Sequence, residues 1–488
     1  MYSNINLLNE LKPIYGDSAE FRPHQEDIIE SILSGKNTLA VLGTGSGKSL
    51  TYFLPTKIRR QNGYAPTIVI SPTISLMNDQ IHSFSKFGTA VTLNSSPDCC
   101  KKDVYDLIEK NQADIIFVSP ETALSNEFIS TMNSMYTVPL IVIDEAHSVS
   151  LYSSDFRPAY SRLREVIKRL NGTPTILGTT ATASNRVVTD LEAQFSEMTT
   201  FRGSLDRPNF IIEAYEMFND AEKKRWLKTN LLKIKQAYGK GVIYCASKDY
   251  VDNVAAFIRE EIGLNTIEFT SETSKNIQRA NDFRDGYIDC LVATEAFGVG
   301  IDIPDIGYII QYQPPLSIES YFQQIGRGGR DIKKVPVMNA VTLYCPQDDK
   351  IVNTLIENSL PSVKTAENIL LHISKSERCT SSEISSILKT REKQPDRFQR
   401  TLNFLIANKY INIRNDLLSL GDKTLDTYAE TRAQNITQKK LEYQKLFDIL
   451  FSNQECIMQQ IRLALNDPSR NIQPCGKCSV CRQNSLRP

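Results

Sequence analysis

The chain has 488 residues, and its 56 Lys+Arg balance 56 Asp+Glu, so the formal net charge is zero. This balance argues against a nucleic-acid binder with an evenly basic surface. The length predicts three or four domains at roughly 150 residues each. Residues 1–10 do not form a basic-then-apolar leader and no apolar run approaches membrane length, so we expect a cytoplasmic protein without membrane contact.

A glycine-rich turn between a predicted strand and a predicted helix is the first informative segment. The strand is the apolar run Thr38–Leu42, and a helical pattern starts at Lys48. The turn reads Thr44, Gly45, Ser46, Gly47, Lys48 and Ser49. Its glycines let N–H groups turn toward phosphate oxygens, the Lys48 ammonium can reach the β- and γ-phosphates, and the Ser49 hydroxyl can ligate Mg²⁺. The turn predicts ATP and Mg²⁺ as cofactors, although alone it could be a tight structural connection.

Two adjacent carboxylates follow a later strand. Residues 141–143 form an apolar β-branched run, and Asp144 and Glu145 come directly after it. A buried parallel strand delivers such side chains to the carboxyl edge of a sheet, where ligands bind in open α/β folds. We expect Asp144 to hold Mg²⁺ through water, Glu145 to deprotonate the water that attacks ATP, and His147 to couple the site to its neighbours. An ordinary acidic helix cap is the alternative.

Apolar β-branched runs alternate with helical stretches along most of the chain. This alternation predicts an α/β fold with two doubly wound, parallel-sheet lobes. The other strands expected in the first lobe are Thr67–Ile70, Asp114–Val118, Leu140–Ile143 and Thr175–Gly178. Those expected in the second lobe are Gly241–Cys245, Thr266–Thr270, Cys290–Ala293, Gly307–Gln311 and Ala340–Tyr344. Thr199–Asn209, which contains Gly203 and Pro208, is the expected hinge between the lobes.

Two arginines of the second lobe stand among glycines. Arg327 and Arg330 alternate with Gly326, Gly328 and Gly329. A surface arginine pair is usually only solvated, but neighbouring glycines indicate a close backbone approach. We therefore expect both guanidinium groups to reach the γ-phosphate of ATP held by the first lobe.

Together these motifs resemble those of RecQ-family DNA helicases of superfamily 2, over about residues 21–331. The glycine-rich turn has the T-G-x-G-K-[ST] form of that superfamily, and the acidic motif reads Asp-Glu-Ala-His. Further matching segments are Phe21–Gln25, Ser71–Gln80, Val118–Glu121, Gly178–Ala183, Leu205–Asn209, Ile243–Cys245 and Ala293–Asp302. The resemblance implies RecA-like lobes, 3′–5′ movement along single-stranded DNA, and unwinding of tailed or forked duplexes.

The resemblance also assigns residues to ligands. It implies that Arg22 and Gln25 read adenine and that Asp302 and Gln323 lie at the nucleotide. It implies DNA contacts by Ser71, Thr73, Asn78, Phe156, Arg157 and Thr294.

Two segments depart from the family pattern. In the aromatic-rich loop after the acidic motif, Tyr152 replaces the usual tryptophan and Ser154 the usual histidine. Phe269–Thr273 occupies the place of a His-Ala-Gly-type motif. The first departure puts the family's relay from DNA to the ATP site in doubt.

The end of the chain is basic and contains a cysteine cluster. Residues 362–488 carry 20 Lys+Arg and 13 Asp+Glu, which indicates either auxiliary DNA contact or a solvated helical surface. Cys456, Cys475, Cys478 and Cys481 could supply four thiolates to a structural Zn²⁺. RecQ helicases have a similar zinc site, with one cysteine on a helix ahead of a closely spaced trio, and we expect Cys456 on such a helix. A disulfide pair is the alternative.

The pattern of helices and a hairpin in residues 362–423 predicts a winged-helix-like module. A generic helical linker is the alternative. Arg397 and Arg400 lie three apart on its third helix, and we expect both to contact DNA phosphates. In the RecQ family such a module follows the zinc site instead of preceding it. The expected elements are helices over Thr365–Ser374, Thr380–Leu388 and Asp396–Asn408 and a hairpin over Tyr410–Leu420.

The expected domain order follows from these segments. It is 1–200 for the ATP-binding lobe, 201–361 for the second lobe, 362–423 for the winged-helix-like module and 424–488 for a helical zinc-binding module. Residues 362–488 are also where we expect protein partners. Two other functions stay open: an RNA-directed superfamily 2 helicase, and an ATPase subunit that remodels a nucleoprotein complex without unwinding.

Overall fold

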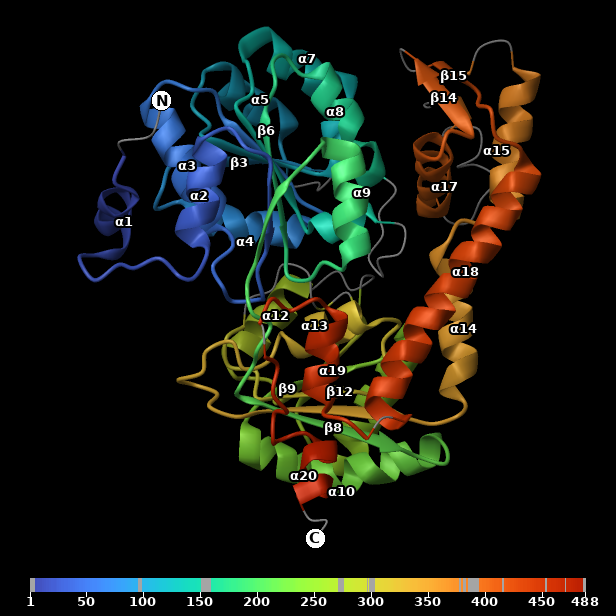
Figure 1. Cartoon of the computed structure of the whole chain (residues 1–488). Helices are drawn as coiled ribbons and strands as arrows, with labels where there is room; N and C mark the ends of the chain where they lie inside the picture. Colours follow the sequence, from blue (N-terminus) through green and yellow to red (C-terminus); the bar gives the residue numbers. More distant parts are fainter. Residues whose placement is uncertain are drawn as a thin grey trace.

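The computed structural model describes residues 5–94, 99–150, 159–270, 276–295, 297, 303–376, 379–380, 383–384, 395–414, 417–452, 454–469 and 471–485. Within these ranges the chain forms two lobes, one above the other in Figure 1, and a C-terminal part that runs beside both. No helix in these ranges combines the length and the apolar character that a membrane crossing needs.

The first lobe is built on a seven-stranded sheet in the order β3-β4-β2-β5-β6-β1-β7, and every neighbouring pair is parallel. Its strands are β1 (Thr38–Val41), β2 (Thr67–Ile70), β3 (Ala90–Leu93), β4 (Ile115–Val118), β5 (Leu140–Asp144), β6 (Thr175–Thr180) and β7 (Thr199–Arg202). Its helices are α1 (Leu7–Tyr15), α2 (Gln25–Leu33), α3 (Leu50–Gln61), α4 (Ile74–Phe84), α5 (Lys101–Glu109), α6 (Pro120–Ala123), α7 (Asn126–Met135), α8 (Leu163–Arg169) and α9 (Asn185–Phe195), with 3₁₀ turns η1 (Ala146–Val149) and η2 (Tyr160–Arg162).

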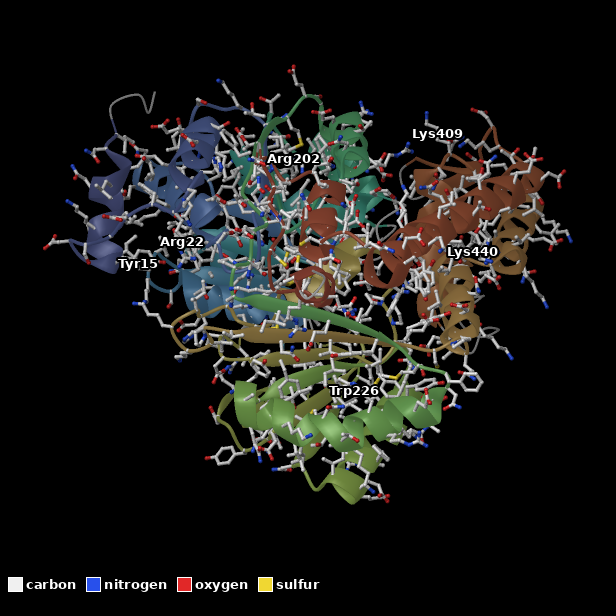
Figure 2. The ribbon with its side chains drawn as sticks, turned by 60° about the horizontal axis from the view of Figure 1, so that its bottom comes forward. Tyr15, Arg22, Arg202, Trp226, Lys409 and Lys440 are labelled. Carbon is white, nitrogen blue, oxygen red and sulfur yellow. The ribbon has the colours of Figure 1, made fainter. Side chains whose placement is uncertain are left out.

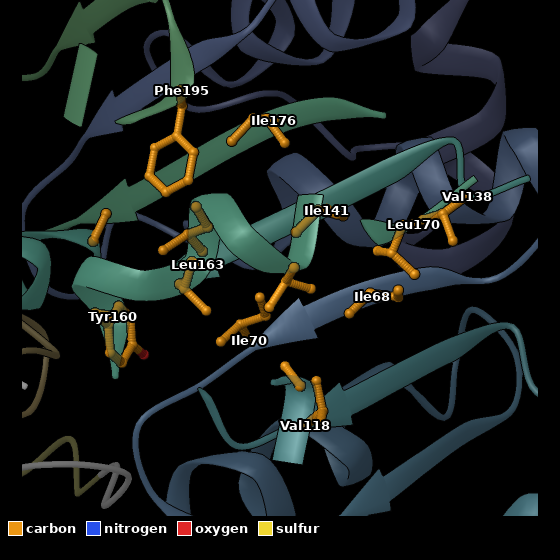
Figure 3. Packing of buried hydrophobic residues seen from close by; sticks show 14 of the residues in the cluster. Ile68, Ile70, Val118, Val138, Ile141, Tyr160, Leu163, Leu170, Ile176 and Phe195 are labelled. Carbon is orange, nitrogen blue, oxygen red and sulfur yellow. The ribbon is translucent and has the colours of Figure 1, made fainter. Parts of the chain in front are cut away.

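Alternate residues of the central strands pack on opposite faces of this sheet. Ile141 of β5 lies in a cluster with Leu163 of α8, and Figure 3 shows this face. Its neighbour Val142 belongs to the other cluster, with Ile28 of α2 and Leu54 of α3. Burial on both faces explains why these strands are continuous apolar runs, as parallel strands between two helical layers are.

The second lobe has a six-stranded parallel sheet in the order β10-β11-β9-β12-β13-β8. Its strands are β8 (Phe210–Glu216), β9 (Gly241–Tyr244), β10 (Thr266–Phe269), β11 (Cys290–Ala293), β12 (Tyr308–Gln311) and β13 (Met338–Tyr344). Its helices are α10 (Asp220–Tyr238), α11 (Lys248–Phe257), η3 (Ile258–Ile262), α12 (Asn276–Arg284), α13 (Ile318–Ile325) and α14 (Asp348–Ser359). Trp226, which is labelled in Figure 2, lies on α10, the long helix of this lobe that is labelled in Figure 1.

The linker between the lobes is shorter than expected. Thr199–Arg202, the start of the predicted hinge, forms β7 and pairs in parallel with β1. Phe210, directly after the predicted hinge, starts β8, which pairs with β13. The first lobe therefore extends past the expected boundary at residue 200, and the linker is residues 203–209. The pattern missed β7 because its residues are half-exposed at a sheet edge and lack a continuous apolar run.

Three elements of the winged-helix-like module have the expected kind and place. They are α15 (Val363–Lys375), α17 (Pro395–Ala407) and the antiparallel hairpin of β14 (Ile411–Arg414) and β15 (Leu417–Leu420). Of the predicted helix Thr380–Leu388, the structure describes residues 380, 383 and 384, the last two as helix. Phe398, Leu402 and Leu405 of α17 are buried in one core with α15.

The boundary predicted at residue 424 divides a unit that the structure keeps together. The helix α18 (Leu425–Phe447) begins in the module, where Tyr428 packs against Phe404 and Tyr410. Its other end brings Leu446 into the core of the second lobe, together with η4 (Asp448–Ser452) and α19 (Ile457–Ala464). The cysteine region therefore shares the second lobe's core, and the last helix is α20 (Ser479–Ser485).

Candidate nucleotide and zinc sites

The glycine-rich turn lies between β1 and α3, at the carboxyl edge of the first sheet. Gly45 and Gly47 have φ of 80° and 77°, a conformation that favours glycine. The Lys48 ammonium donates to the Leu42 carbonyl at 3.0 Å, and burial lowers the pKa of Lys48 while Glu145 and Asp144 oppose that shift. The ammonium thus lies inside the turn, near both carboxylates.

Arg22 and Gln25 contact the same turn from the N-terminal end of α2. Gln25 Nε2 donates to the carbonyls of Ser46 at 3.1 Å and Gly47 at 2.9 Å, and Arg22 Nη1 donates to the carbonyl of Gly45. A Cβ atom on Gly47 would lie 2.6 Å from Gln25 Nε2, so a larger residue would displace this amide from the turn. The structure thereby places the predicted adenine-reading pair against the predicted phosphate loop.

Asp144 ends β5, and its buried carboxylate is held from two sides. Thr179 Oγ1 donates to Oδ1 at 2.6 Å and Gln80 Nε2 donates to Oδ2 at 2.8 Å. Burial raises the pKa of Asp144 and the negative Glu145 raises it further, while the two hydrogen bonds lower it. Tyr160 OH donates to the Asp144 carbonyl at 3.0 Å. The motifs did not predict a role for Gln80, Thr179 or Tyr160, although Gln80 and Thr179 lie inside the matching segments.

His147 links Glu145 to the second lobe. Its Nδ1 lies 3.4 Å from Glu145 Oε2 and 2.9 Å from Thr180 Oγ1, and its Nε2 lies 3.4 Å from the Gln323 amide. The Thr180 hydroxyl donates its proton to the Thr182 carbonyl at 2.8 Å, so Nδ1 of His147 is the donor to Thr180. Nε2 then accepts from Gln323. His147 therefore contacts residues of both lobes, and its coupling role stays a prediction.

The turn that carries the two arginines contacts the phosphate loop directly. Thr44 Oγ1 donates to the carbonyl of Gly326 at 2.9 Å, and a Cβ atom at Gly326 would approach that hydroxyl equally closely. Arg327 and Arg330 lie near enough to Lys48 for their charges to lower its pKa. The site therefore gathers three cations and two carboxylates at the junction of the lobes, as hydrolysis of a triphosphate with Mg²⁺ requires.

Four predicted DNA contacts lie on described residues of the two lobes. Ser71 follows β2 and is buried, and Thr73 caps the first turn of α4 with its hydroxyl. Asn78 is exposed on α4, and Thr294 follows β11. Three of the four therefore lie at or just beyond the carboxyl ends of parallel strands, where open α/β sheets bind ligands.

The two arginines expected to contact DNA lie on α17. Arg400 is exposed, whereas for Arg397 the structure describes only its place in the helix. One turn beyond Arg400, Asn403 is buried against Arg162 of the first lobe. Lys409, which follows α17, is exposed at the periphery of the molecule (Figure 2).

Several predicted features lie outside the described residues. They are Phe156, Arg157, Tyr152, Ser154, Asp302 and the segment 271–273.

The four cysteines come together as a thiol cluster. Their Sγ atoms all lie within 4.8 Å of one another. Tetrahedral Zn²⁺ with Zn–S bonds of about 2.3 Å needs S···S separations of about 3.8 Å, which small side-chain adjustments would reach. Four backbone N–H groups donate to the sulfurs of Cys456, Cys475 and Cys478, and such donors favour thiolates. The donor set therefore fits zinc.

One detail of this cluster differs from expectation. Cys456 does not lie inside a helix: it is the N-cap residue of α19, the helix ahead of the other three cysteines. Cap geometry leaves its thiol facing the loop of the other three cysteines. The amphipathic pattern predicted a helix there but could not locate its break.

The sequence matches two family descriptions. Residues 22–191 match "DEAD/DEAH box helicase" and residues 222–331 match "Helicase conserved C-terminal domain". The first segment lies in the first lobe and the second segment lies in the second lobe.

Curated relatives are similar over most of the chain. "Probable ATP-dependent DNA helicase RecS" of Bacillus subtilis is 28% identical over 478 residues, covering 94% of this chain and 89% of the relative. "ATP-dependent DNA helicase RecQ" of Haemophilus influenzae is 34% identical over 347 residues, covering 70% of this chain. The match spans only 54% of that relative's own length.

A solved structure shares the fold at low sequence identity. Helicase Lhr of Mycobacterium smegmatis, bound to single-stranded DNA and AMP-PNP, has a TM-score of 0.59 and 17% identity, covering 89% of this chain and 62% of that one. The likeness confirms the two RecA-like lobes.

Proposed function

This chain belongs to the RecQ family of DEAD/DEAH box helicases, and on that premise we propose that it couples ATP hydrolysis to 3′–5′ movement along single-stranded DNA and to duplex unwinding. ATP and Mg²⁺ are the cofactors that a helicase ATPase implies. Relatives named as DNA helicases support DNA as the partner. The proposed DNA substrates are single strands and tailed or forked duplexes.

The observation that carries the proposal is the division of the nucleotide site between two lobes. The first lobe supplies Lys48, Asp144 and Glu145, and the second supplies Arg327 and Arg330. Thr44 and Gly326 hold the halves together through one hydrogen bond, and His147 and Gln323 through another. Binding of a triphosphate would strengthen this junction and hydrolysis would weaken it, so each ATP turnover would move one lobe against the other.

Within this site each residue has a proposed role. Lys48 and the two arginines would neutralise phosphate charge, and Ser49 and Asp144 would hold the metal. Glu145 would accept a proton from the attacking water, and His147, whose Nδ1 lies 3.4 Å from Glu145, would link it to Gln323 of the second lobe. Arg22 and Gln25 would bind adenine once they leave the carbonyls of the phosphate loop.

The four-cysteine cluster would hold a structural Zn²⁺. All four positions of a tetrahedral ion would be filled by Cys456, Cys475, Cys478 and Cys481. Because the cluster shares the core of the second lobe, the ion would stabilise that lobe directly. Residues 362–488 would also serve as the surface for protein partners.

The decisive experiment measures ATPase and strand separation on matched nucleic acids. Purified protein is given single-stranded DNA or RNA of one sequence, and then duplexes with a 3′ tail, a 5′ tail or a fork. We expect stimulation by DNA and unwinding of the 3′-tailed and forked duplexes. Lys48→Ala should be inactive, which excludes a contaminating ATPase.

Other outcomes point to the alternatives. Stimulation by RNA alone would make the chain an RNA-directed helicase. DNA-stimulated hydrolysis without strand separation on any substrate would favour an ATPase that remodels a nucleoprotein complex.

The winged-helix-like module would add a second DNA contact through α17. Reversing Arg397 and Arg400 to glutamate should weaken duplex binding and reduce its salt dependence, because each phosphate contact adds roughly one unit to the slope of log affinity against log salt. Basal ATPase should stay near normal. An unchanged affinity and slope would make the module a protein-docking or structural element instead.

A further inference from the structure

We propose that Arg207, on the linker between the lobes, is a phosphate-binding residue of the nucleotide site; this inference rests on the proposed ATPase function. Arg207 lies in the matching segment Leu205–Asn209, to which neither the motifs nor the other contacts of the site give a role. Its guanidinium stands where the linker passes between the phosphate loop and the turn that carries Arg327 and Arg330.

The contacts of Arg207 reach both sides of the lobe junction. Nη2 donates to the carbonyls of Gly328 at 2.9 Å and Gly329 at 3.2 Å, in the turn of the second lobe. Nη1 lies 3.5 Å from the Thr44 hydroxyl of the phosphate loop. At least two of the five guanidinium N–H donors are not used by these contacts. A planar guanidinium with free donors beside a phosphate loop suits a phosphate oxygen.

The charge around Arg207 is unbalanced. In the described part of the chain Arg207 forms no ion pair with a carboxylate, and its charged neighbour is a second cation, Arg330. Burial, and then the charge of Arg330, lower the pKa of Arg207 to about 10, so it remains protonated at neutral pH. A half-buried guanidinium that has no carboxylate partner among the described residues is costly unless an anion binds it. The triphosphate of ATP is the anion that this site is built to receive.

The linker holds Arg207 in place from behind. Phe210 lies under the guanidinium, with its ring centroid 4.4 Å from the Arg207 Cζ atom. Asn209 Nδ2 donates to the Gly329 carbonyl at 3.0 Å, and a Cβ atom at Gly329 would lie 2.4 Å from that amide. Gly329 also has a φ of 57°. The turn and the linker are therefore fitted to each other around Arg207.

The cysteine region fixes the other end of the linker. Asp467, in the loop after α19, accepts hydrogen bonds from the Leu205 N–H and from Arg462 Nε, each at 2.8 Å. Arg462 Nη1 also pairs with Asp206 at 3.2 Å. Because the two residues before Arg207 are held, its side chain is presented to the junction with little freedom to move away, which is how a preorganised phosphate ligand is built.

The test compares two substitutions that differ in charge. Arg207→Lys and Arg207→Gln can both donate to the Gly328 and Gly329 carbonyls, but only lysine keeps a cation for phosphate. Binding of fluorescently labelled AMP-PNP is measured by anisotropy, with Mg²⁺ present, for the wild type, both variants and Arg225→Ala. Arg225 is exposed on α10 and serves as the matched control. Melting temperatures confirm that each variant is folded.

We expect Arg207→Gln to weaken AMP-PNP binding by about 10- to 100-fold, the usual range for a charged hydrogen bond. Arg207→Lys should retain most of the affinity, and Arg225→Ala should equal the wild type. Equal affinities for Arg207→Lys and Arg207→Gln would overturn the phosphate role. The hydrogen bonds to the Gly328 and Gly329 carbonyls would then account for Arg207 without any contact to phosphate. If the wild type itself failed to bind AMP-PNP, the proposed ATPase function would be wrong. That result would be distinct from a failure of the Arg207 assignment alone.

Discussion

Arg162 of the first lobe donates a hydrogen bond to Asn403 of α17 at 2.9 Å, across 241 positions of sequence. The same guanidinium pairs with Glu165 through Nε and Nη2, at 3.0 and 2.8 Å. Figure 1 shows α17 between the first lobe and α15. The helix expected to meet DNA therefore also docks its module against the ATP-binding lobe. Arg162 lies two residues beyond Tyr160, which contacts the Asp144 carbonyl.

Asn403→Ala should release this docking. A hydrogen bond to a charged group contributes about 1.5–3 kcal/mol, so the undocked population should rise by about tenfold or more. Single-molecule energy transfer between dyes on α7 and the β14–β15 hairpin would measure it. Arg164→Ala is the control, since Arg164 is exposed next to the docking site. An unchanged distance distribution in Asn403→Ala would show that other contacts hold the module.

Glu145→Gln should bind ATP but hydrolyse it at least about 100-fold more slowly, since an amide cannot accept the proton of water. Labelled-nucleotide binding and phosphate release measure the two effects separately. Normal turnover would remove Glu145 as the base. Glu127→Gln, at an exposed position of α7, is a control that should behave as the wild type.

Arg330→Ala should lower kcat by roughly 10³-fold with little change in ATP affinity, because a guanidinium that neutralises transition-state charge acts mainly during bond cleavage. Arg327→Ala should have a similar or milder effect. Steady-state kinetics would separate kcat from KM. A raised KM with intact kcat would show that the residue stabilises bound ATP instead.

Acid pH should inactivate the enzyme earlier than the ordinary pKa of aspartate would predict. Burial raises the pKa of Asp144, and the metal needs the ionised carboxylate, so activity is lost as pH falls through this raised value. Gln80→Leu removes a hydrogen bond that lowers the pKa of Asp144, so the acid limb of the ATPase profile should move to higher pH. Gln61→Leu, at an exposed position, should leave the limb in place. A profile that does not move in Gln80→Leu would contradict this account of Asp144.

Metal analysis should find about one zinc per chain. Cys478→Ser should lower the melting temperature of the second lobe and reduce solubility, because Cys478 is buried in that lobe's core. Cys379→Ser, a buried cysteine outside the cluster, should not change the zinc content. A metal-free protein that stays folded and active would contradict a structural zinc site.

The sequence predicted the site residues that lie next to a strand or a glycine-rich turn. Asp144 and Glu145 stand at the end of a short apolar strand, and Lys48 stands at the end of the glycine-rich turn that follows another, so both positions can be predicted from adjacent residues. The buried central strands were found for the same reason. The half-exposed edge strand β7 was missed because its pairing with β1 is not encoded in an apolar run.

Contacts between distant segments could not be predicted in this way. Gln80 and Thr179 reach Asp144 from two other elements of the first lobe, and Arg207 meets Gly328 only when the second lobe has folded. The docking of Asn403 on Arg162 likewise depends on how whole domains pack. The local sequence around Arg207 shows only that a charged residue lies in a short linker, between Gly203 and Pro208.

Helix α18 joins the core of the winged-helix-like module at Tyr428 to the core of the second lobe at Leu446. Its 23 residues span about 34 Å at 1.5 Å per residue. Such a rod acts as a lever: a rotation of about 10° at the second lobe would carry its far end roughly 6 Å. If the lobes move against each other as proposed, α18 would therefore transmit an enlarged displacement to the winged-helix-like module.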